Sequence, residues 1–191
     1  LNNLYNQTQL QGVYGINCVA LVDGQPRVLD LKQFLDLFVK HRREVVTRRT
    51  VFLLRRERQR GHILEGQAVA LANIDAVVEL IKTSPDAAEA RTRLMARGWT
   101  SANVLELLAR TGSDACRPDG LPEQFGFVGG LYYLSDEQSQ AILDMRLHRL
   151  TSLEQGKLIE EYQGILDEIA ALLGILASTE RLLDVIRGEL K

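Results

Sequence analysis

The fold of this chain follows from residues 38–60, which read FVKHRREVVTRRTVFLLRRERQR. Between residues 40 and 60 there are nine Lys or Arg and only two acids, Glu44 and Glu57, an excess of seven positive charges. The whole chain carries a net charge of −2, so its positive charge is concentrated in one segment. A long basic helix is typical of an arm that lies near a polyanion. The alternative is a solvated helix face whose arginines pair with acids elsewhere.

The basic segment lies inside one predicted helix that is far longer than usual. A capping box at residues 30–33 starts this helix, and no proline follows for more than 50 residues. The pattern predicts a helix over residues 31–82, about 75–80 Å long at ~1.5 Å per residue. Gly61 and Gly66 predict a bend, because each glycine costs a helix interior about 1 kcal/mol relative to alanine. Residues 73–75 are a second candidate for a break.

A second long helix is predicted at the end of the chain, from a capping box at residues 151–154 to about residue 190. From residue 158 onward its apolar residues alternate at spacings of four and three over more than four heptads, which indicates a coiled-coil seam. An amphipathic helix on an ordinary globular core is the alternative. The predicted seam consists of Leu158, Tyr162, Ile165, Ile169, Leu172, Leu176, Leu183 and Ile186, with Thr179 between Leu176 and Leu183.

The natural partner of this seam is the first long helix, because the two helices enclose the middle of the chain and can lie antiparallel. The first helix is basic and the last is acidic, which favours the pairing. Antiparallel alignment is expected to place Glu180 and Asp184 near the arginines of residues 42–49. The expected facing column on the first helix consists of Phe38, Val45 and Phe52, which recur every seven residues.

The remaining segments complete a mainly α fold. Residues 1–29 contain a short helix and two β-rich stretches around an Asp-Gly turn, which predicts a β-hairpin near the N-terminus. Residues 84–150 contain several short helices, one of which is expected to start at a capping box at residues 135–138, and a glycine-rich loop. This pattern predicts a small helical globular knob. The predicted architecture is a long antiparallel two-helix coiled coil, built from residues 30–83 and 151–191, with the knob at its tip.

The knob presents the best candidate for an interaction surface. Its first helix is expected to begin at Pro85, with Ser84 as the cap. Aromatic and large aliphatic side chains cluster over residues 132–150, and a self-complementary apolar patch would give a two-fold dimer. The alternative is that these side chains are the core of the knob itself. The candidate dimer contacts are Tyr132, Tyr133, Leu134, Ile142, Met145 and Leu147.

The chain shows no pattern that is typical of an enzyme. Apolar residues make up 46% of it, which argues against disorder, and no apolar run approaches the roughly 20 residues that span a bilayer. Its two cysteines, Cys18 and Cys116, and its three scattered histidines have no metal-ligand spacing. No glycine-rich phosphate loop is present. We therefore expect this chain alone to perform no chemistry and to hold no metal or cofactor.

Several stretches together resemble the A-subunit family of bacterial DNA gyrase, a type IIA DNA topoisomerase. The matching stretches are residues 4–11, 15–17, 38–50, 62–66, 70–75, 132–135 and 140–147. The resemblance covers essentially the whole chain and implies a fragment with the coiled-coil arm and the exit gate (C-gate), where the protein dimerises. The chain begins at Leu1 rather than Met, which also favours a fragment. The long insert at residues 85–130 is more similar to gyrase than to topoisomerase IV.

The resemblance implies a structural and mechanical role. The arm would link a DNA-cleaving gate to a dimeric exit gate, through which the transported duplex leaves during ATP-dependent negative supercoiling. The family's nucleophilic tyrosine would lie upstream, so no catalytic residue carries over. ATP and Mg would be used on the partner subunit. The implied partners are a second copy, duplex DNA and the gyrase B subunit, in the bacterial cytoplasm. The DNA-facing candidates are Arg42, Arg43, Arg48 and Arg49.

Three other interpretations stay open at this point. The chain could be a basic helical hairpin that binds nucleic acid by itself, or the equivalent module of topoisomerase IV. An autonomous enzyme is a third, which the absent motifs disfavour. We expect weak DNA binding at most, because acids on the last helix can neutralise the arginines.

Overall fold

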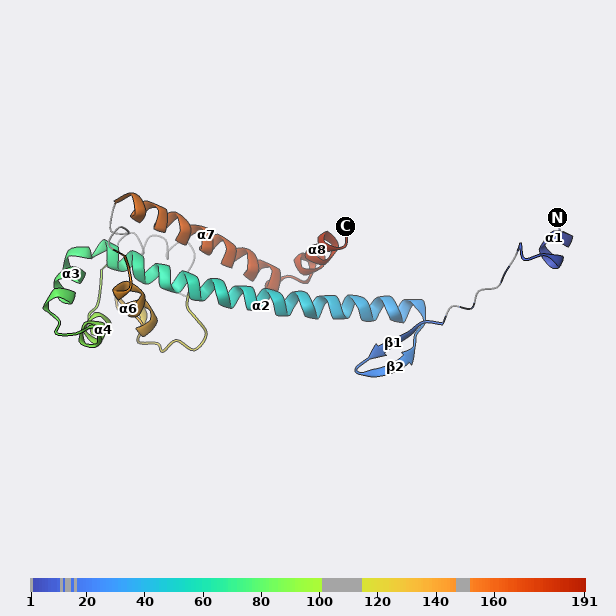
Figure 1. Ribbon diagram of the computed structural model, residues 1–191, viewed down its shortest axis with the longest axis horizontal. Helices are drawn as coiled ribbons and strands as arrows, with labels where there is room; N and C mark the ends of the chain where they lie inside the picture. Colours follow the sequence, from blue (N-terminus) through green and yellow to red (C-terminus); the bar gives the residue numbers. More distant parts are fainter. Residues whose placement is uncertain (1, 11, 13–14, 16, 101–114, 147–151) are drawn as a thin grey trace. The chain divides into compact units, whose positions relative to one another are not determined.

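The computed structural model of the chain describes residues 2–10, 12, 15, 17–100, 115–146 and 152–191. It divides into two compact units, Leu1–Val45 and Val46–Lys191, and the boundary falls inside the longest helix (Figure 1).

The first unit contains the predicted hairpin. A short helix, α1 (Asn2–Gln7), precedes strands β1 (Val19–Val22) and β2 (Gln25–Val28), which pair antiparallel. The turn residues Asp23 and Gly24 both have positive φ, 53° and 79°, as a two-residue turn that matches the twist of its strands requires. The two-stranded sheet near the N-terminus is thus confirmed.

Helix α2 (Leu31–Ala72) begins with the predicted capping box. The Gln33 amide donates to Asp30 Oδ1 at 2.6 Å, and the Asp30 amide donates to Gln33 Oε1 at 3.3 Å. The helix ends ten residues earlier than expected, and α3 (Ile74–Thr83) follows a break at Asn73. The Asn73 side chain donates to the carbonyl oxygens of Val69 and Thr100, at 2.9 and 2.6 Å, which holds the break in place.

Helix α2 continues through the two glycines at which a bend was predicted, with no break in the helix at either residue. Both glycines are buried where another segment comes close to the helix. A Cβ atom on Gly61 would lie 2.5 Å from Cys116 Sγ, and one on Gly66 would lie 2.7 Å from Gln138 Cγ. The glycines therefore serve close packing, and this benefit outweighs their low helix propensity.

In the second unit α7 (Ser152–Ala177) lies alongside the C-terminal part of α2 (Figure 1). Ion pairs join Arg60 to Glu161 and Arg49 to Glu189. Arg49 precedes Arg60 on α2, whereas its partner Glu189 follows Glu161 in the chain. The C-terminal segment therefore runs antiparallel to α2, as predicted. We call α2 from Val46 onward, together with α7 and the helix α8 (Thr179–Glu189), the arm.

The predicted continuous helix over residues 151–190 is wrong, because Ser178 separates α7 from α8. Ser178 has extended backbone angles (φ −127°, ψ 119°), and its hydroxyl accepts from the Arg181 amide at 3.4 Å. A serine with this geometry is an N-cap, which starts a new helix. The break also shifts the apolar stripe, so that Leu182 is buried, with 9% exposed, and Leu183 is only half-buried.

Five of the predicted seam residues on α7, Leu158, Tyr162, Ile165, Ile169 and Leu172, are buried, and Leu176 is half-buried. Ile186 is buried on α8 in a small cluster with Val46 and Leu182. The expected column on α2 is wrong, since Phe38 and Phe52 are 42% and 64% exposed. The buried column on α2 contains many small or polar residues and consists of Val46, Thr50, Leu54, Glu57, Gly61, Leu64, Ala68 and Leu71.

The tip consists of α3, α4 (Ala87–Ala96), strands β3 (Gly126–Val128) and β4 (Leu131–Tyr133), and α6 (Asp136–Leu143). Strands β3 and β4 pair antiparallel, and Trp99 forms a bridge to Tyr132. The predicted capping box of Ser135 and Gln138 starts α6. Trp99, Leu94, Leu134 and Ile142 belong to the same apolar core as Leu64 and Val69 of α2, so the tip packs directly on the arm.

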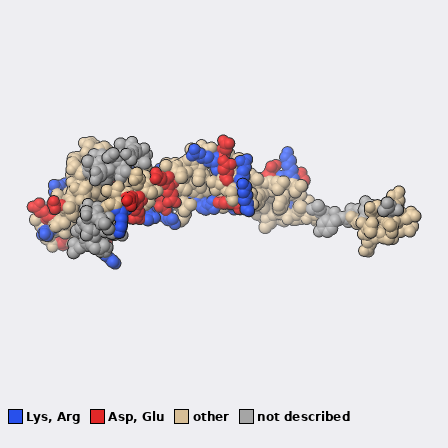
Figure 2. All heavy atoms as spheres, turned by 90° about the horizontal axis from the view of Figure 1, so that it is seen from above, with Lys and Arg blue, Asp and Glu red and all other residues tan. Residues whose placement is uncertain are grey.

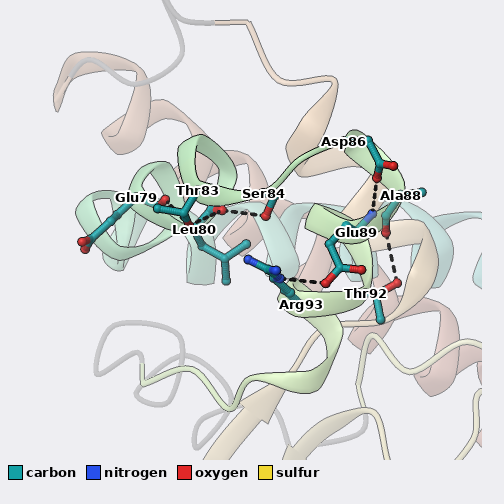
Figure 3. A network of polar contacts seen from close by, with 9 residues as sticks. All are labelled: Glu79, Leu80, Thr83, Ser84, Asp86, Ala88, Glu89, Thr92 and Arg93. Carbon is teal, nitrogen blue, oxygen red and sulfur yellow. Dashed lines mark hydrogen bonds and ion pairs between the residues drawn. The ribbon is translucent and has the colours of Figure 1, made fainter.

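The turn between α3 and α4 differs from the prediction by two residues (Figure 3). Ser84 ends α3, and its hydroxyl donates to the Leu80 carbonyl at 2.8 Å. Asp86 is the N-cap of α4 and accepts from the Glu89 amide at 2.7 Å. An ion pair of 2.9 Å between Arg93 and Glu89 follows one turn later. Asp and Ser are about equally good N-caps, and the negative charge of Asp86 also interacts favourably with the positive end of the helix macrodipole.

The close approach at Gly66 predicts a large difference between two glycine substitutions. Gly66→Ala is expected to lower the free energy of unfolding by about 1–3 kcal/mol, because the new methyl group meets the Gln138 side chain. The matched control is Gly164→Ala on α7, where nothing lies within 4 Å. It is expected to raise stability by up to about 1 kcal/mol. Urea unfolding followed by circular dichroism measures both, and equal stabilities for the two variants would contradict the packing.

Candidate functional site

The four predicted DNA-facing arginines all lie on α2. Arg42 is half-buried and Arg43 exposed in the first unit, and Arg48 and Arg49 are exposed in the second. Arg49 forms an ion pair with Glu189 of α8. Glu189 is thus one acid opposite this segment, whereas Asp184, which was expected there, forms an ion pair of 2.8 Å with Arg187 on its own helix.

The later part of the basic segment is also paired with carboxylates. Arg60 pairs with Glu161 of α7, and Arg56 lies 3.0 Å from the neighbouring Glu57. Arg55 and Arg58 both contact Asp119, which belongs to the loop before β3. On the face shown in Figure 2, blue and red side chains are interleaved, without one continuous blue field. This pairing agrees with the alternative interpretation of the basic segment, in which its arginines pair with acids from elsewhere in the chain.

The solvent-exposed side of α2 between residues 48 and 60 nevertheless has a simple composition. Glu57, the one acid within these residues, is buried and 2% exposed. At 3.6 residues per turn the exposed residues share one side of the helix. We call this surface the arginine face; it consists of Arg48, Arg49, Phe52, Arg55, Arg56, Gln59 and Arg60.

The candidate dimer contacts divide into two groups. Tyr132, Leu134 and Ile142 are 3%, 0% and 4% exposed, because they form the core between the tip and the arm. These three have almost no surface left for a second copy. Tyr133 and Met145 are half-buried, so contact with a second copy stays a prediction for them. Leu147 lies outside the described residues.

A buried polar cluster that the sequence analysis did not find joins the tip to α2. Gln138 is at its centre and is 0% exposed. Its side-chain nitrogen lies 2.6 Å from the His62 carbonyl oxygen, 2.8 Å from the Tyr132 hydroxyl and 3.2 Å from His62 Nδ1. Its side-chain oxygen accepts from the Ser135 amide at 2.9 Å. One glutamine therefore caps α6 and binds α6 to α2.

The histidine in this cluster is held in its neutral form. His62 Nε2 lies 2.8 Å from Ser135 Oγ, while Nδ1 accepts from Gln138. Burial lowers the pKa of His62 to about 4, and the nearby Arg117 guanidinium contributes to this lowering. A neutral ring that donates from Nε2 and accepts at Nδ1 satisfies both partners.

The cluster continues toward α7 through a second set of polar groups. The Tyr132 hydroxyl also hydrogen-bonds to Glu65, which is buried on α2 three residues after His62. The Tyr162 hydroxyl of α7 faces Cys116 and Glu65. Burial raises the pKa of the Cys116 thiol to about 12 and raises the pKa of both tyrosines. All three groups are therefore protonated, which is the opposite of what an activated nucleophile requires.

The described residues offer no site for a metal. No group of three or more His, Cys, Asp or Glu that could hold an ion occurs among residues with a described placement. Within the same residues, no helix is both long enough and apolar enough to cross a membrane. In the second unit, two antiparallel helices bear a helical tip that is fastened to them by apolar packing and by the Gln138 cluster.

Comparison with known proteins assigns the chain to a family. The family model for the A subunit of DNA gyrase/topoisomerase IV matches residues 1–191. The chain is 63% identical over 191 residues to the DNA gyrase A subunit of Pseudomonas aeruginosa and 60% identical over 190 residues to that of Aeromonas salmonicida. Each alignment covers 100% of this chain and 21% of the relative. The chain therefore belongs to the DNA gyrase/topoisomerase IV A-subunit family and spans about a fifth of the length of these relatives.

The buried His62 predicts a loss of stability in acid. Between pH 6.5 and about pH 4 the unfolded chain binds a proton at His62 that the folded chain does not bind. The free energy of unfolding therefore falls as the pH falls through this window, by about 3 kcal/mol at most. Below about pH 4 both states are protonated, and this group causes no further loss.

The test compares His62→Gln with His41→Gln, which replaces an exposed histidine of α2. Urea unfolding across the pH window is expected to show a flatter dependence for His62→Gln and the wild-type dependence for His41→Gln. Identical slopes for wild type and His62→Gln would contradict the neutral, buried state of this ring.

Proposed function

We propose that this chain is the coiled-coil arm and exit gate of a DNA gyrase A subunit. In the whole enzyme the arm links the DNA-cleaving gate to the exit gate, and the gate opens to release the transported duplex during ATP-dependent negative supercoiling. Its partners are a second copy of the same chain, duplex DNA and the gyrase B subunit, in the bacterial cytoplasm. ATP and Mg act on the partner subunit. This chain transmits movement between the gates and carries no catalytic residue.

The observation that carries the proposal is the antiparallel pairing of the two helices of the arm around the tip. The Arg60–Glu161 ion pair and the contact of Gly61 with Ile165 align α2 with α7 next to the tip. Farther along the arm, Val46 packs against Leu182 and Ile186 of α8. A pair of helices resists bending and twisting better than one helix, which suits an element that transmits movement between two gates.

The buried polar cluster supports the mechanical role. A movement of the arm can reach the tip only through the contacts between them, and these include the hydrogen bonds of Gln138 to the backbone and side chain of His62. Buried hydrogen bonds of this kind are costly to break, because their groups lose water without replacement. The tip is therefore expected to follow α2 as one body.

The choice of gyrase over topoisomerase IV is supported by the relatives. The DNA gyrase A subunit of Salmonella typhimurium is 55% identical over 191 residues, in addition to the two relatives named above. The family model itself covers both enzymes, so the proposal at this level depends on sequence identity. The alternative of a helical hairpin that grips nucleic acid alone is favoured by one observation, the arginine face.

The exit gate requires two copies of the chain to meet at the tip. Tyr133 and Met145 are half-buried there, and Phe127 and Val128 of β3 are 40% and 42% exposed. A patch that meets its own copy across a two-fold axis doubles every favourable contact, and also every unfavourable one. One added charge in such a patch is thus opposed by the same charge on the partner.

We expect the chain to sediment at twice the 21.4 kDa of one copy. Met145→Glu is expected to weaken the dimer at least tenfold, because it buries like charges at the two-fold contact. Ala88→Glu is the matched control, since it adds the same charge on the exposed first turn of α4. A monomeric wild type, or equal weakening by the two variants, would contradict an exit gate at this surface.

A further inference from the structure

The loop at residues 115–125 is ordered by one arginine. Arg117 donates from Nη1 to the Phe125 carbonyl at 3.0 Å, and from Nη2 to the carbonyls of Leu121 and Pro122, both at 2.9 Å. Two backbone hydrogen bonds, Leu121 to Pro118 and Phe125 to Pro122, close the turns of the loop. A loop held by its own arginine keeps its shape without support from solvent-exposed side chains.

This ordered loop places one carboxylate on the arm. Asp119 Oδ2 lies 3.1 Å from Arg55 Nε, and Asp119 Oδ1 lies 3.3 Å from Arg58 Nη1. The two oxygens thus engage two arginines that are three residues apart on α2. Arg55 belongs to the arginine face, and Arg58 lies at its edge with 23% of its side chain exposed.

A guanidinium group binds a carboxylate and a phosphate in the same way, by parallel charge-assisted hydrogen bonds. The oxygens of Asp119 therefore occupy positions that phosphate oxygens of a polyanion would take on Arg55 and Arg58. To the arginine face around them α2 contributes five arginines, no exposed acid and the exposed ring of Phe52, while Glu161 and Glu189 pair with the arginines at its two ends. Its charge and its extended, regular shape fit the backbone of duplex DNA.

We infer that the loop of residues 115–125 is an electrostatic strap, in which Asp119 competes with DNA phosphates for Arg55 and Arg58 and so keeps the affinity of the arginine face for duplex DNA low. The exposed ion pairs of Asp119 are weak individually, and salt screens them. The strap can therefore be displaced when a duplex lies against the face, and it closes again when the duplex leaves. Such a surface guides DNA past the arm without retaining it.

The inference depends on the proposed function only for the choice of duplex DNA as the polyanion. Its physical content is a competition between two anions for two named arginines. This competition predicts a specific effect of removing the carboxylate of Asp119, separate from the general effect of making the chain less negative.

The experiment measures binding of the 191-residue chain to a short fluorescent DNA duplex over a range of salt concentrations. Asp119→Asn is expected to tighten binding about threefold to tenfold at low salt, since Arg55 and Arg58 are released. The slope of log K against log salt is expected to steepen by about one to two, one for each additional phosphate that the arginines reach. Circular dichroism and urea unfolding check that the variant folds as the wild type does.

Two controls make the comparison specific. Glu123→Gln removes one negative charge from the same loop, where Glu123 is exposed and Asp119 holds the two arginines. It is expected to change affinity by less than about twofold, with an unchanged slope. Replacing Arg55 and Arg58 by Gln in the Asp119→Asn chain is expected to return the affinity to the wild-type value or below it.

Equal gains in Asp119→Asn and Glu123→Gln would overturn the strap, because only net charge would then matter. No gain in Asp119→Asn, or a gain that persists without the two arginines, would overturn it as well. Sedimentation of the same samples reports the dimer separately. A monomeric chain whose Asp119→Asn variant binds tighter would refute the exit gate and leave the strap standing, and a dimer without this gain would do the reverse.

Discussion

The structure of the second unit depends on the close contact between α2 and α6 at Gly66. Because this residue has no side chain, Gln138 can lie against the helix and reach the backbone and the ring of His62. The same glutamine caps α6 and contacts Tyr132, so the tip, the strand pair and the arm share one buried group. The apolar core around this group supplies most of the stabilisation. The Gln138 cluster fixes how the tip is oriented on α2, because all of its hydrogen bonds can form in only one arrangement of the two.

Arginines of α2 in the arm are paired with acids from three other segments of the chain. Acids from α7, from α8 and from the loop at residues 115–125 approach the edges of the basic helix, at Arg60, Arg49 and Arg55. These pairs are exposed and individually weak, so they contribute little to the stability of the fold. Their larger effect is on what the basic helix can bind, because each carboxylate occupies a guanidinium that could otherwise meet a phosphate. In the proposed role beside an exit gate, this arrangement would let the arm attract DNA without retaining it.

The features of the fold that could be predicted from the sequence were those set by turn and capping motifs and by the order of the elements along the chain. The Asp-Gly turn and the capping boxes of α2 and α6 followed from residues close together in the sequence. The antiparallel direction of α7 followed from the order of the chain, because the two long helices enclose its middle. The column on α2 was misplaced because heptad counting favoured the large residues Phe38 and Phe52, whereas the buried column near the tip uses Thr50, Gly61 and Ala68. The Gln138 cluster and the Asp119 contacts were missed because they join residues that are 76 positions apart in one case and 61 and 64 in the other. No spacing rule reaches that far; only the packed structure brings these groups together.

The antiparallel arm is the central claim, and distances between spin labels test it most directly. Labels are placed on exposed positions, at Gln59 of α2 paired with either Gln163 or Ala177 of α7, in a chain with Cys18 replaced and Cys116 left buried. The account predicts that Gln163 lies closer to Gln59 than Ala177 does, by up to about 20 Å, since roughly 14 residues of helix separate the two α7 sites at ~1.5 Å each. Equal distances, or a shorter distance to Ala177, would contradict the antiparallel arm and with it the proposed transmission between gates.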